Sequence, residues 1–193
     1  MAARGGMCAW GVVVVCAGLW AQAQPAAQGS TAEFIMSGTS TVRGWSCPAR
    51  GAVTITAGTS GQAVPGFPSG ISSATIRVPV KAIECEEPDM RVHLQEALNE
   101  PANPEIVYQL EQYTLSGSNA ATTKGQLTVA GVTRPVDINV KLVSASGSTR
   151  VVGEISIDLT TFSVTPPTLW LGMLKVGKDV RVRFDVVLPS SSP

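Results

Sequence analysis

The chain has 193 residues, with 14 Lys and Arg against 14 Asp and Glu and a formal net charge of +0 at pH 7. It has no basic stripe and no interleaving of aromatic and basic residues, which argues against nucleic acid as a partner. Gly, Ser, Thr and Pro are plentiful and long helical patterns are almost absent, so the composition predicts one β-rich domain.

The first 23 residues are typical of a secretory signal peptide. Arg4 precedes the apolar stretch of residues 8–20, and Ala21 and Ala23 supply the small residues of a cleavage site. We therefore expect cleavage after Ala23 and a periplasmic or secreted protein. The apolar stretch is too short for a relaxed membrane span, so we expect no transmembrane span in the mature chain.

The remaining chain divides into a disordered tail at residues 24–32, a β-barrel domain at residues 33–189 and a short C-terminal tail at residues 190–193. Two of the four cysteines remain in it, Cys47 and Cys85. In an oxidising compartment, such a pair is expected to form a disulfide. Two free thiols or a weak metal site are the alternatives, although neither cysteine has a His or a second Cys near it in the sequence.

Alternation of apolar and polar residues predicts eight strands. They cover residues 33–43, 52–56, 71–80, 105–113, 125–129, 136–142, 151–159 and 180–188. With mostly short connections, these strands fit an antiparallel meander, which loses its exposed edges when it closes into a barrel. A β-sandwich is the structural alternative.

One short helix is expected at residues 88–98. Pro88 suits its first turn, and Met90, Leu94, Ala97 and Leu98 fall on one face. Such a short helix needs packing to persist, so we expect it to lie across the barrel and close one end.

The segment of residues 125–142 resembles the signature hairpin of the YceI-like family. The matching residues are Gly125, Leu127, Thr128, Val129, Gly131, Val132, Thr133, Arg134, Pro135 and Val136. The segment of residues 89–108, with His93-Leu94 and the Asn103-Pro104 strand start, is similar to the family's helical insertion. The resemblance covers residues 34–188 and implies an all-β, single eight-stranded antiparallel lipocalin-like barrel with one short helix, enclosing a polyisoprenoid lipid. The family's first strand usually carries a His that residues 37–45 lack, which leaves the identity of the ligand open.

The inward faces of the expected strands are apolar and contain no charged side chain, so a cavity there would suit a hydrocarbon-like chain. The candidate ligand-binding residues on these faces are Phe34, Ile76, Val78, Ile106, Tyr108, Leu110, Ile138, Val140, Ile157, Val182 and Phe184. Trp170, Met173 and Leu174 complete the set, from an apolar run within the expected loop of residues 160–179. For any single strand residue, ordinary core packing is the better interpretation. The apolar run is compatible with a lip at the barrel mouth, an inward plug or a homodimer contact.

No catalytic motif and no metal-ligand spacing occurs, so we expect neither an enzyme nor a metal or other cofactor. His93, the one histidine, is interpreted as a helix-surface residue. The sequence thus predicts an exported protein that encloses a long apolar lipid non-covalently, by resemblance a polyisoprenoid or isoprenoid quinone, for carriage or storage. The alternatives are a ligand-free structural or interaction module of the cell envelope, with its interior filled by its own side chains, and an accessory enzyme that uses His93.

Overall fold

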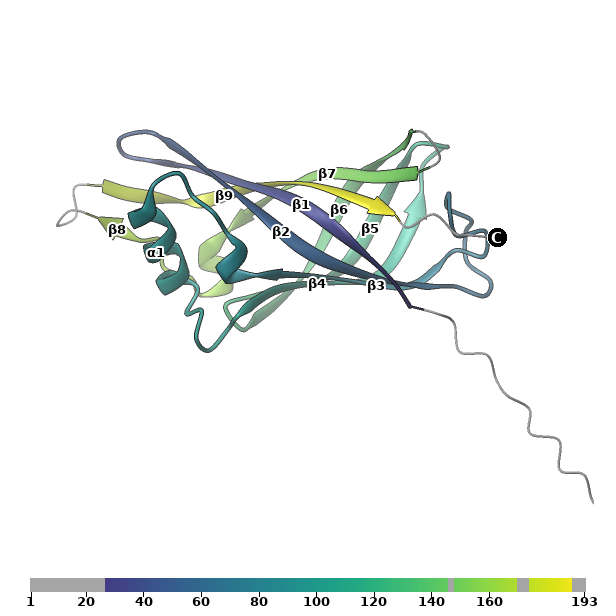
Figure 1. Ribbon diagram of the computed structural model, residues 1–193, viewed down its shortest axis with the longest axis horizontal. Helices are drawn as coiled ribbons and strands as arrows, with labels where there is room; N and C mark the ends of the chain where they lie inside the picture. Colours follow the sequence, from purple (N-terminus) through teal and green to yellow (C-terminus); the bar gives the residue numbers. More distant parts are fainter. Residues whose placement is uncertain (1–26, 146–147, 170–173, 189–193) are drawn as a thin grey trace, which may run out of the picture.

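The computed structural model describes residues 27–145, 148–169 and 174–188 (Figure 1). In chain order the elements are β1 (Ala27–Ser40), β2 (Gly44–Ala57), β3 (Ile71–Pro79), the 3-10 turn η1 (Val80–Ala82), α1 (Pro88–Ala97), β4 (Glu105–Leu115), β5 (Ala120–Val129), β6 (Val132–Ala145), β7 (Ser148–Asp158), the 3-10 turn η2 (Leu159–Phe162), β8 (Thr168–Leu169) and β9 (Leu174–Leu188). Of the helices in these ranges, none has the length and the apolar character that a membrane span requires.

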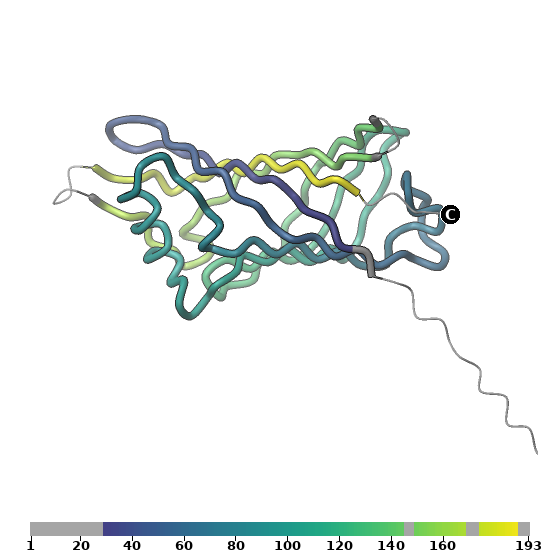
Figure 2. The backbone as a smooth tube through the Cα atoms, in the orientation of Figure 1, coloured from purple at the N-terminus to yellow at the C-terminus, as the bar shows by residue number. Residues whose placement is uncertain are grey.

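The strands form one closed antiparallel cylinder. From β1 to β7 each strand pairs with the next, and β9 pairs with both β7 and β1 (Figure 2). The two-residue β8 pairs with the start of β9 and stands outside the cylinder. The predicted eight-stranded antiparallel barrel is therefore confirmed, and the β-sandwich alternative is wrong.

The strands alternate between an apolar interior and a charged exterior. On β2, for example, every second residue from Cys47 to Ile55 is buried, and the residues that alternate with them are exposed. Outward-facing side chains form exposed ion pairs, such as Arg183 Nε with Glu154 Oε2 at 2.8 Å. Because exposed ion pairs contribute only about 0–1 kcal/mol each, the stability of the barrel comes mainly from its apolar interior.

Several strands are longer than the sequence pattern predicts. β1 begins at Ala27, so part of the tail expected at residues 24–32 belongs to this strand. These residues are held by pairing with β2, where Ala27 lies opposite Thr56. β9 begins at Leu174 instead of residue 180, and Val176 pairs with Ser40 of β1. Residues 1–26 lie outside the described chain, so the signal peptide stays a prediction.

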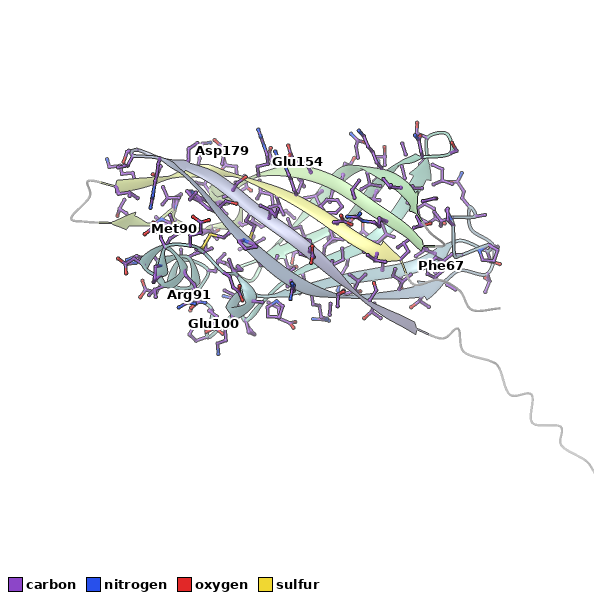
Figure 3. All side chains as sticks on the ribbon, turned by 45° about the horizontal axis from the view of Figure 1, so that its top comes forward. Phe67, Met90, Arg91, Glu100, Glu154 and Asp179 are labelled. Atoms are coloured by element: carbon purple, nitrogen blue, oxygen red, sulfur yellow. A yellow bond between two sulfur atoms is a disulfide. The ribbon has the colours of Figure 1, made fainter. Side chains whose placement is uncertain are left out.

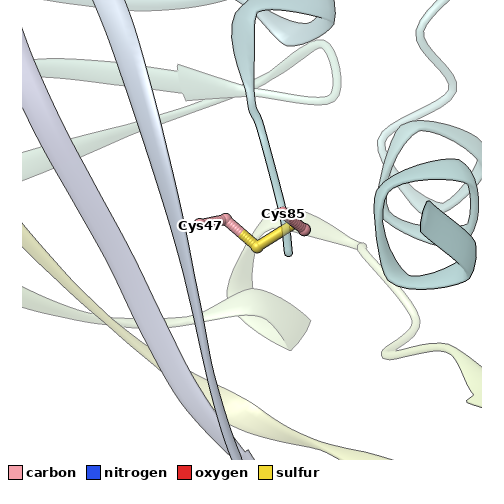
Figure 4. Close-up of a disulfide and its surroundings, with 2 residues drawn as sticks. All are labelled: Cys47 and Cys85. Atoms are coloured by element: carbon pink, nitrogen blue, oxygen red, sulfur yellow. A yellow bond between two sulfur atoms is a disulfide. The ribbon is translucent and has the colours of Figure 1, made fainter. Parts of the chain in front are cut away.

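One end of the barrel, here called the helix end, carries α1 (Figure 1). A disulfide joins Cys47 of β2 to Cys85, just before α1, with the two Cα atoms 4.3 Å apart (Figure 4). Beside it, the Glu84 amide donates to the Pro48 carbonyl at 2.8 Å. The predicted disulfide is confirmed, and it fixes the approach of α1 to the barrel.

The opposite end, here called the loop end, carries residues 58–70 between β2 and β3. Val64 and Phe67 pair their backbones there, and their side chains are only 7% and 1% exposed. Figure 3 shows Phe67 at this end and Met90 of α1 at the other. A Pro- and Gly-rich connection thus folds inward and covers the loop end with apolar side chains.

Candidate functional site: an apolar cavity inside the barrel

The interior of the barrel, here called the lumen, contains a cavity of about 220 Å³. Its wall is built from all eight barrel strands, with Leu94 and Leu98 closing the helix end and Val64 the loop end. Among the described residues that line it, none is Asp, Glu, Lys, Arg or His. Cavities of about 150 Å³ lined by Leu, Ile and Phe bind benzene, whereas pockets for larger ligands usually span about 300–1,000 Å³. The lumen therefore has room for part of a hydrocarbon chain as it stands.

The strand residues singled out from the sequence come together around this cavity. They are Phe34, Ile76, Val78, Ile106, Tyr108, Leu110, Ile138, Val140, Ile157, Val182 and Phe184. Leu174 is buried but is not among the lining residues, because β9 starts there and pairs it with Leu169. Trp170 and Met173 lie outside the described residues. The role of all these residues in ligand binding stays a prediction.

The helix also lies where it was expected. Leu94 of α1 and Leu98, its C-cap, reach the cavity from the helix end, and Met90 is buried beside them. His93 does not line the lumen; its Nδ1 lies 3.1 Å from Glu96 Oε2, and its side chain is 38% exposed. No group of three or more His, Cys, Asp or Glu side chains within the described ranges is arranged to hold a metal ion.

Sequence analysis missed several lining residues, among them Tyr113 and Leu115 of β4. The alternation that places Ile106, Tyr108 and Leu110 inside would place both outside. A β-bulge reverses the phase, because Leu110 pairs with Gly125 but Gln112 pairs with Lys124. One extra residue in a strand shifts every later side chain to the other face, and nothing in the residue types marks the position.

Trp45 of β2 also lines the cavity. Its indole Nε1 is buried and has no hydrogen-bond partner in the part of the chain that the structure describes. The ring lies against Gly38 on β1, such that a Cβ on Gly38 would lie 2.5 Å from the ring carbon Cζ2. The ring therefore occupies space that only a glycine leaves free.

Two polar side chains of the lumen, those of Tyr108 and Thr123, form a short hydrogen-bonded chain. The Tyr108 hydroxyl donates to Thr123 Oγ1 at 3.2 Å, and the Thr123 hydroxyl donates to the Ile138 carbonyl at 3.3 Å. Burial raises the pKa of Tyr108 above its ordinary value of 10.0, since a phenolate would be poorly solvated there. Tyr108 is therefore protonated at neutral pH, and the lumen carries no charge on it.

The YceI-like domain model matches residues 24–188 of the sequence. The chain belongs to the YceI-like family. Among solved structures, this YceI-like protein is similar to Burkholderia cenocepacia BcnA, at 16% identity and a TM-score of 0.61, over 82% of this chain and 96% of that one. It is also similar to a polyisoprenoid binding domain from Saccharophagus degradans, at 11% identity and a TM-score of 0.60, over 85% and 98% of the two chains.

A third relative of this YceI-like chain is the Campylobacter jejuni YCEI protein, at 13% identity and a TM-score of 0.53, over 61% of this chain and 72% of that one. A comparison with curated protein sequences gives no match. At such low identities, the structural likeness establishes the fold that these proteins share.

Proposed function

We propose that this protein is exported and binds a long apolar lipid in its lumen, a polyisoprenoid or an isoprenoid quinone, for carriage or storage. The observation that carries the proposal is the uncharged cavity walled by apolar side chains from all eight barrel strands. Transfer of a hydrocarbon chain from water into such a site is favourable by about 0.8 kcal/mol per CH₂. A phosphate or a sugar would find no compensating charge there.

Two further observations support this proposal. The Saccharophagus degradans domain of similar fold is described as polyisoprenoid binding. The Cys47–Cys85 disulfide suits an oxidising compartment outside the cytoplasm. We infer that the protein acts by binding and not by catalysis, since the cavity offers apolar contacts in place of an acid, a base or a nucleophile activated by one.

The second candidate is a ligand-free module of the cell envelope. The size of the cavity favours it, because about 220 Å³ is below the usual range for ligand pockets. Under our proposal, a long chain enters only if an end of the barrel or the side chains of the lumen yield. Extraction of the purified protein with organic solvent, followed by mass spectrometry of the extract and of the native protein, separates the two candidates.

A pair of neighbouring substitutions on β7 makes this test specific. Ile155 lines the cavity and Ser156 is exposed. Ile155→Trp fills part of the lumen and is expected to reduce the copurifying lipid, whereas Ser156→Trp should leave the amount unchanged. Absence of lipid from the wild-type protein, together with no rise in Tm on addition of a prenyl lipid, would contradict the proposal, because a bound ligand stabilises the folded state by mass action.

A further inference from the structure

The barrel wall is split between β3 and β4 near the loop end. The two strands pair from Ala74 with Leu110 to Pro79 with Glu105. Beyond Ala74, β3 continues only on β2, where Ile71 pairs with Ala57. In the described chain, residues 71–73 have no backbone pairing with β4, which continues on β5 alone.

The bulge in β4 lies at the start of this separation. Glu111 is the extra residue between the pairs of Leu110 with Gly125 and of Gln112 with Lys124. A bulge bends its strand and ends regular pairing. Here it turns β4 away from β3 and at the same time turns Tyr113 into the lumen.

A pocket of about 200 Å³, here called the side pocket, opens on the outer surface at this separation. Gln62, Ser72, Glu111 and Gln112 are the polar side chains that line it. Its remaining lining includes Ile71, Leu110 and Tyr113, which also line the lumen. The wall between the side pocket and the lumen is therefore a single layer of side chains.

The hydroxyl of Tyr113 bridges the split. It accepts a hydrogen bond from the Ile71 amide at 3.1 Å and donates one to the Gln62 carbonyl at 2.6 Å. The Gln62 side chain in turn accepts from the Leu115 amide at 3.2 Å. One side-chain hydroxyl thus replaces the backbone ladder and holds residues 58–70 against β4. A side-chain contact of this kind opens by a rotamer change, without separation of paired strands.

A second separation lies between β6 and β7, toward the helix end, but it is covered. Those strands pair only from Val140 with Gly153 to the turn that joins them. Beyond that point η2 packs against β6, where Arg134 Nε donates to the Thr161 carbonyl at 3.1 Å and Phe162 is 3% exposed. This difference singles out the split between β3 and β4.

The charges around the side pocket select against anions. Glu111 is the charged side chain in its lining, where it accepts a hydrogen bond from Gln126 Nε2 at 3.0 Å. Lys124, which lies opposite Gln112 on β5, is directed toward Asp137, with Nζ 3.9 Å from Oδ2. An anionic head group would meet Glu111 without a cation in the described lining, whereas a hydroxyl or carbonyl head would find neutral hydrogen-bonding side chains.

We propose that the side pocket is the entrance to the lumen and the site of the ligand's head group. The hydrocarbon chain passes Tyr113 into the lumen, and an uncharged, hydrogen-bonding head remains beside Gln62, Ser72 and Gln112. This inference rests on the proposed function and adds a ligand class to it, namely neutral lipids in preference to carboxylates and phosphates.

Retinol and retinoic acid are suitable probes because they share one isoprenoid skeleton and differ in the charge of the head group. At neutral pH, the wild-type protein is expected to bind retinol at least about threefold more tightly than retinoate. This modest factor is the size expected for repulsion between the retinoate carboxylate and Glu111 near a solvated surface. Glu111→Gln should reduce this ratio toward one. Equal affinities for the two probes, unchanged in Glu111→Gln, would overturn the head-group assignment.

The release rate of bound retinol tests the entrance. Tyr113→Phe removes both hydrogen bonds of the bridge and keeps the ring, so release should be about tenfold faster. Gln112→Trp fills the side pocket from outside and should slow both association and release of retinol. This variant tests the entrance if Tyr113→Phe does not fold. The matched control is Arg134→Gln, which weakens the cover of the second separation and should leave the release rate unchanged.

The outcomes separate the two proposals. If neither probe binds and no lipid is extracted from the protein, lipid binding itself fails. If retinol binds but its release is accelerated by Arg134→Gln and not by Tyr113→Phe, or if Gln112→Trp leaves both rates unchanged, lipid binding stands and the entrance between β3 and β4 is wrong.

Discussion

The ring of Phe184 lies over Gly153, its direct partner across β7 and β9. A Cβ on Gly153 would lie 3.0 Å from the ring carbon Cε1. Tyr108 lies over Gly125, a diagonal neighbour on β5, where a Cβ would lie 2.7 Å from Cζ, and Trp45 lies over its direct partner Gly38. Because these glycines leave space at the wall, the large rings lie along the wall instead of filling the lumen.

Substitution of Gly153 by Ala is expected to force the Phe184 ring inward. Overpacking of this kind usually lowers the free energy of unfolding by about 1–3 kcal/mol, and the ring would take up part of the cavity. The measurement is denaturant unfolding together with retinol affinity. Gly29→Ala on β1 is the control, since the nearest atom to its Cβ would be 4.0 Å away. Equal stability of the two variants would contradict this role for Gly153.

Substitution of Leu94 by Ala removes one side chain that closes the helix end. Leu94 is 7% exposed, so the change should lower the free energy of unfolding by about 2–5 kcal/mol and enlarge the cavity. We expect the variant to accept a bulkier prenyl ligand than the wild type, measured by native mass spectrometry. Val92→Ala on the same helix should change neither property, because Val92 is 46% exposed and does not line the cavity.

The disulfide should be a large single contribution to stability. Cys47 and Cys85 have a sequence separation of 38, for which the chain-entropy estimate of the contribution is about 4 kcal/mol. The double variant Cys47→Ala, Cys85→Ala should therefore unfold at a clearly lower denaturant concentration. Reduction of the wild-type protein should produce a similar shift, and the double variant should be insensitive to reductant.

Acid should weaken the junction of β7 with η2. The hydrogen bond from Lys178 Nζ, followed by those from Thr160, lowers the pKa of Asp158 from 3.8 to about 2. A carboxyl group with a lower pKa in the folded state stabilises that state at pH values above its unfolded-state pKa. This contribution is lost as the pH falls from about 4 to about 2. In Tm measurements across this range, Asp158→Asn should be less stable than the wild type at neutral pH and should lose less on acidification. Parallel pH profiles would show that Asp158 contributes no such linkage.

The period-two pattern sufficed to predict the barrel and most of the cavity wall. Ile76, Ile138 and Val182, for example, all lie inside as their alternation indicates. Alternation is informative wherever one face of a strand is buried and pairing is regular. It does not reveal a bulge, and so Tyr113 could not be assigned to the lumen from sequence.

Segments rich in Ser and Thr or in Pro and Gly are the other places where the structure differs from the sequence pattern. The Ser- and Thr-rich start of β1 carries little apolar signal, and its pairing with β2 becomes evident only in three dimensions. Phe67 stands among Pro and Gly residues that predict a loop, and its side chain is only 1% exposed. Local composition predicts that such a segment turns, but burial depends on which end of the barrel it must cover.

Closure of the cylinder also sets the order in which it can fold. Phe34 on β1 and Phe184 on β9 pair across 150 positions of sequence, so β9, the last strand of the cylinder in chain order, completes two ladders at once. Pairings this far apart carry a high entropic cost and place such a topology among slow folders, with times of about milliseconds to seconds. Until β9 docks, β1 and β7 each have an edge with unpaired backbone groups that other chains can bind. Nascent or truncated molecules should therefore be the form most prone to aggregate.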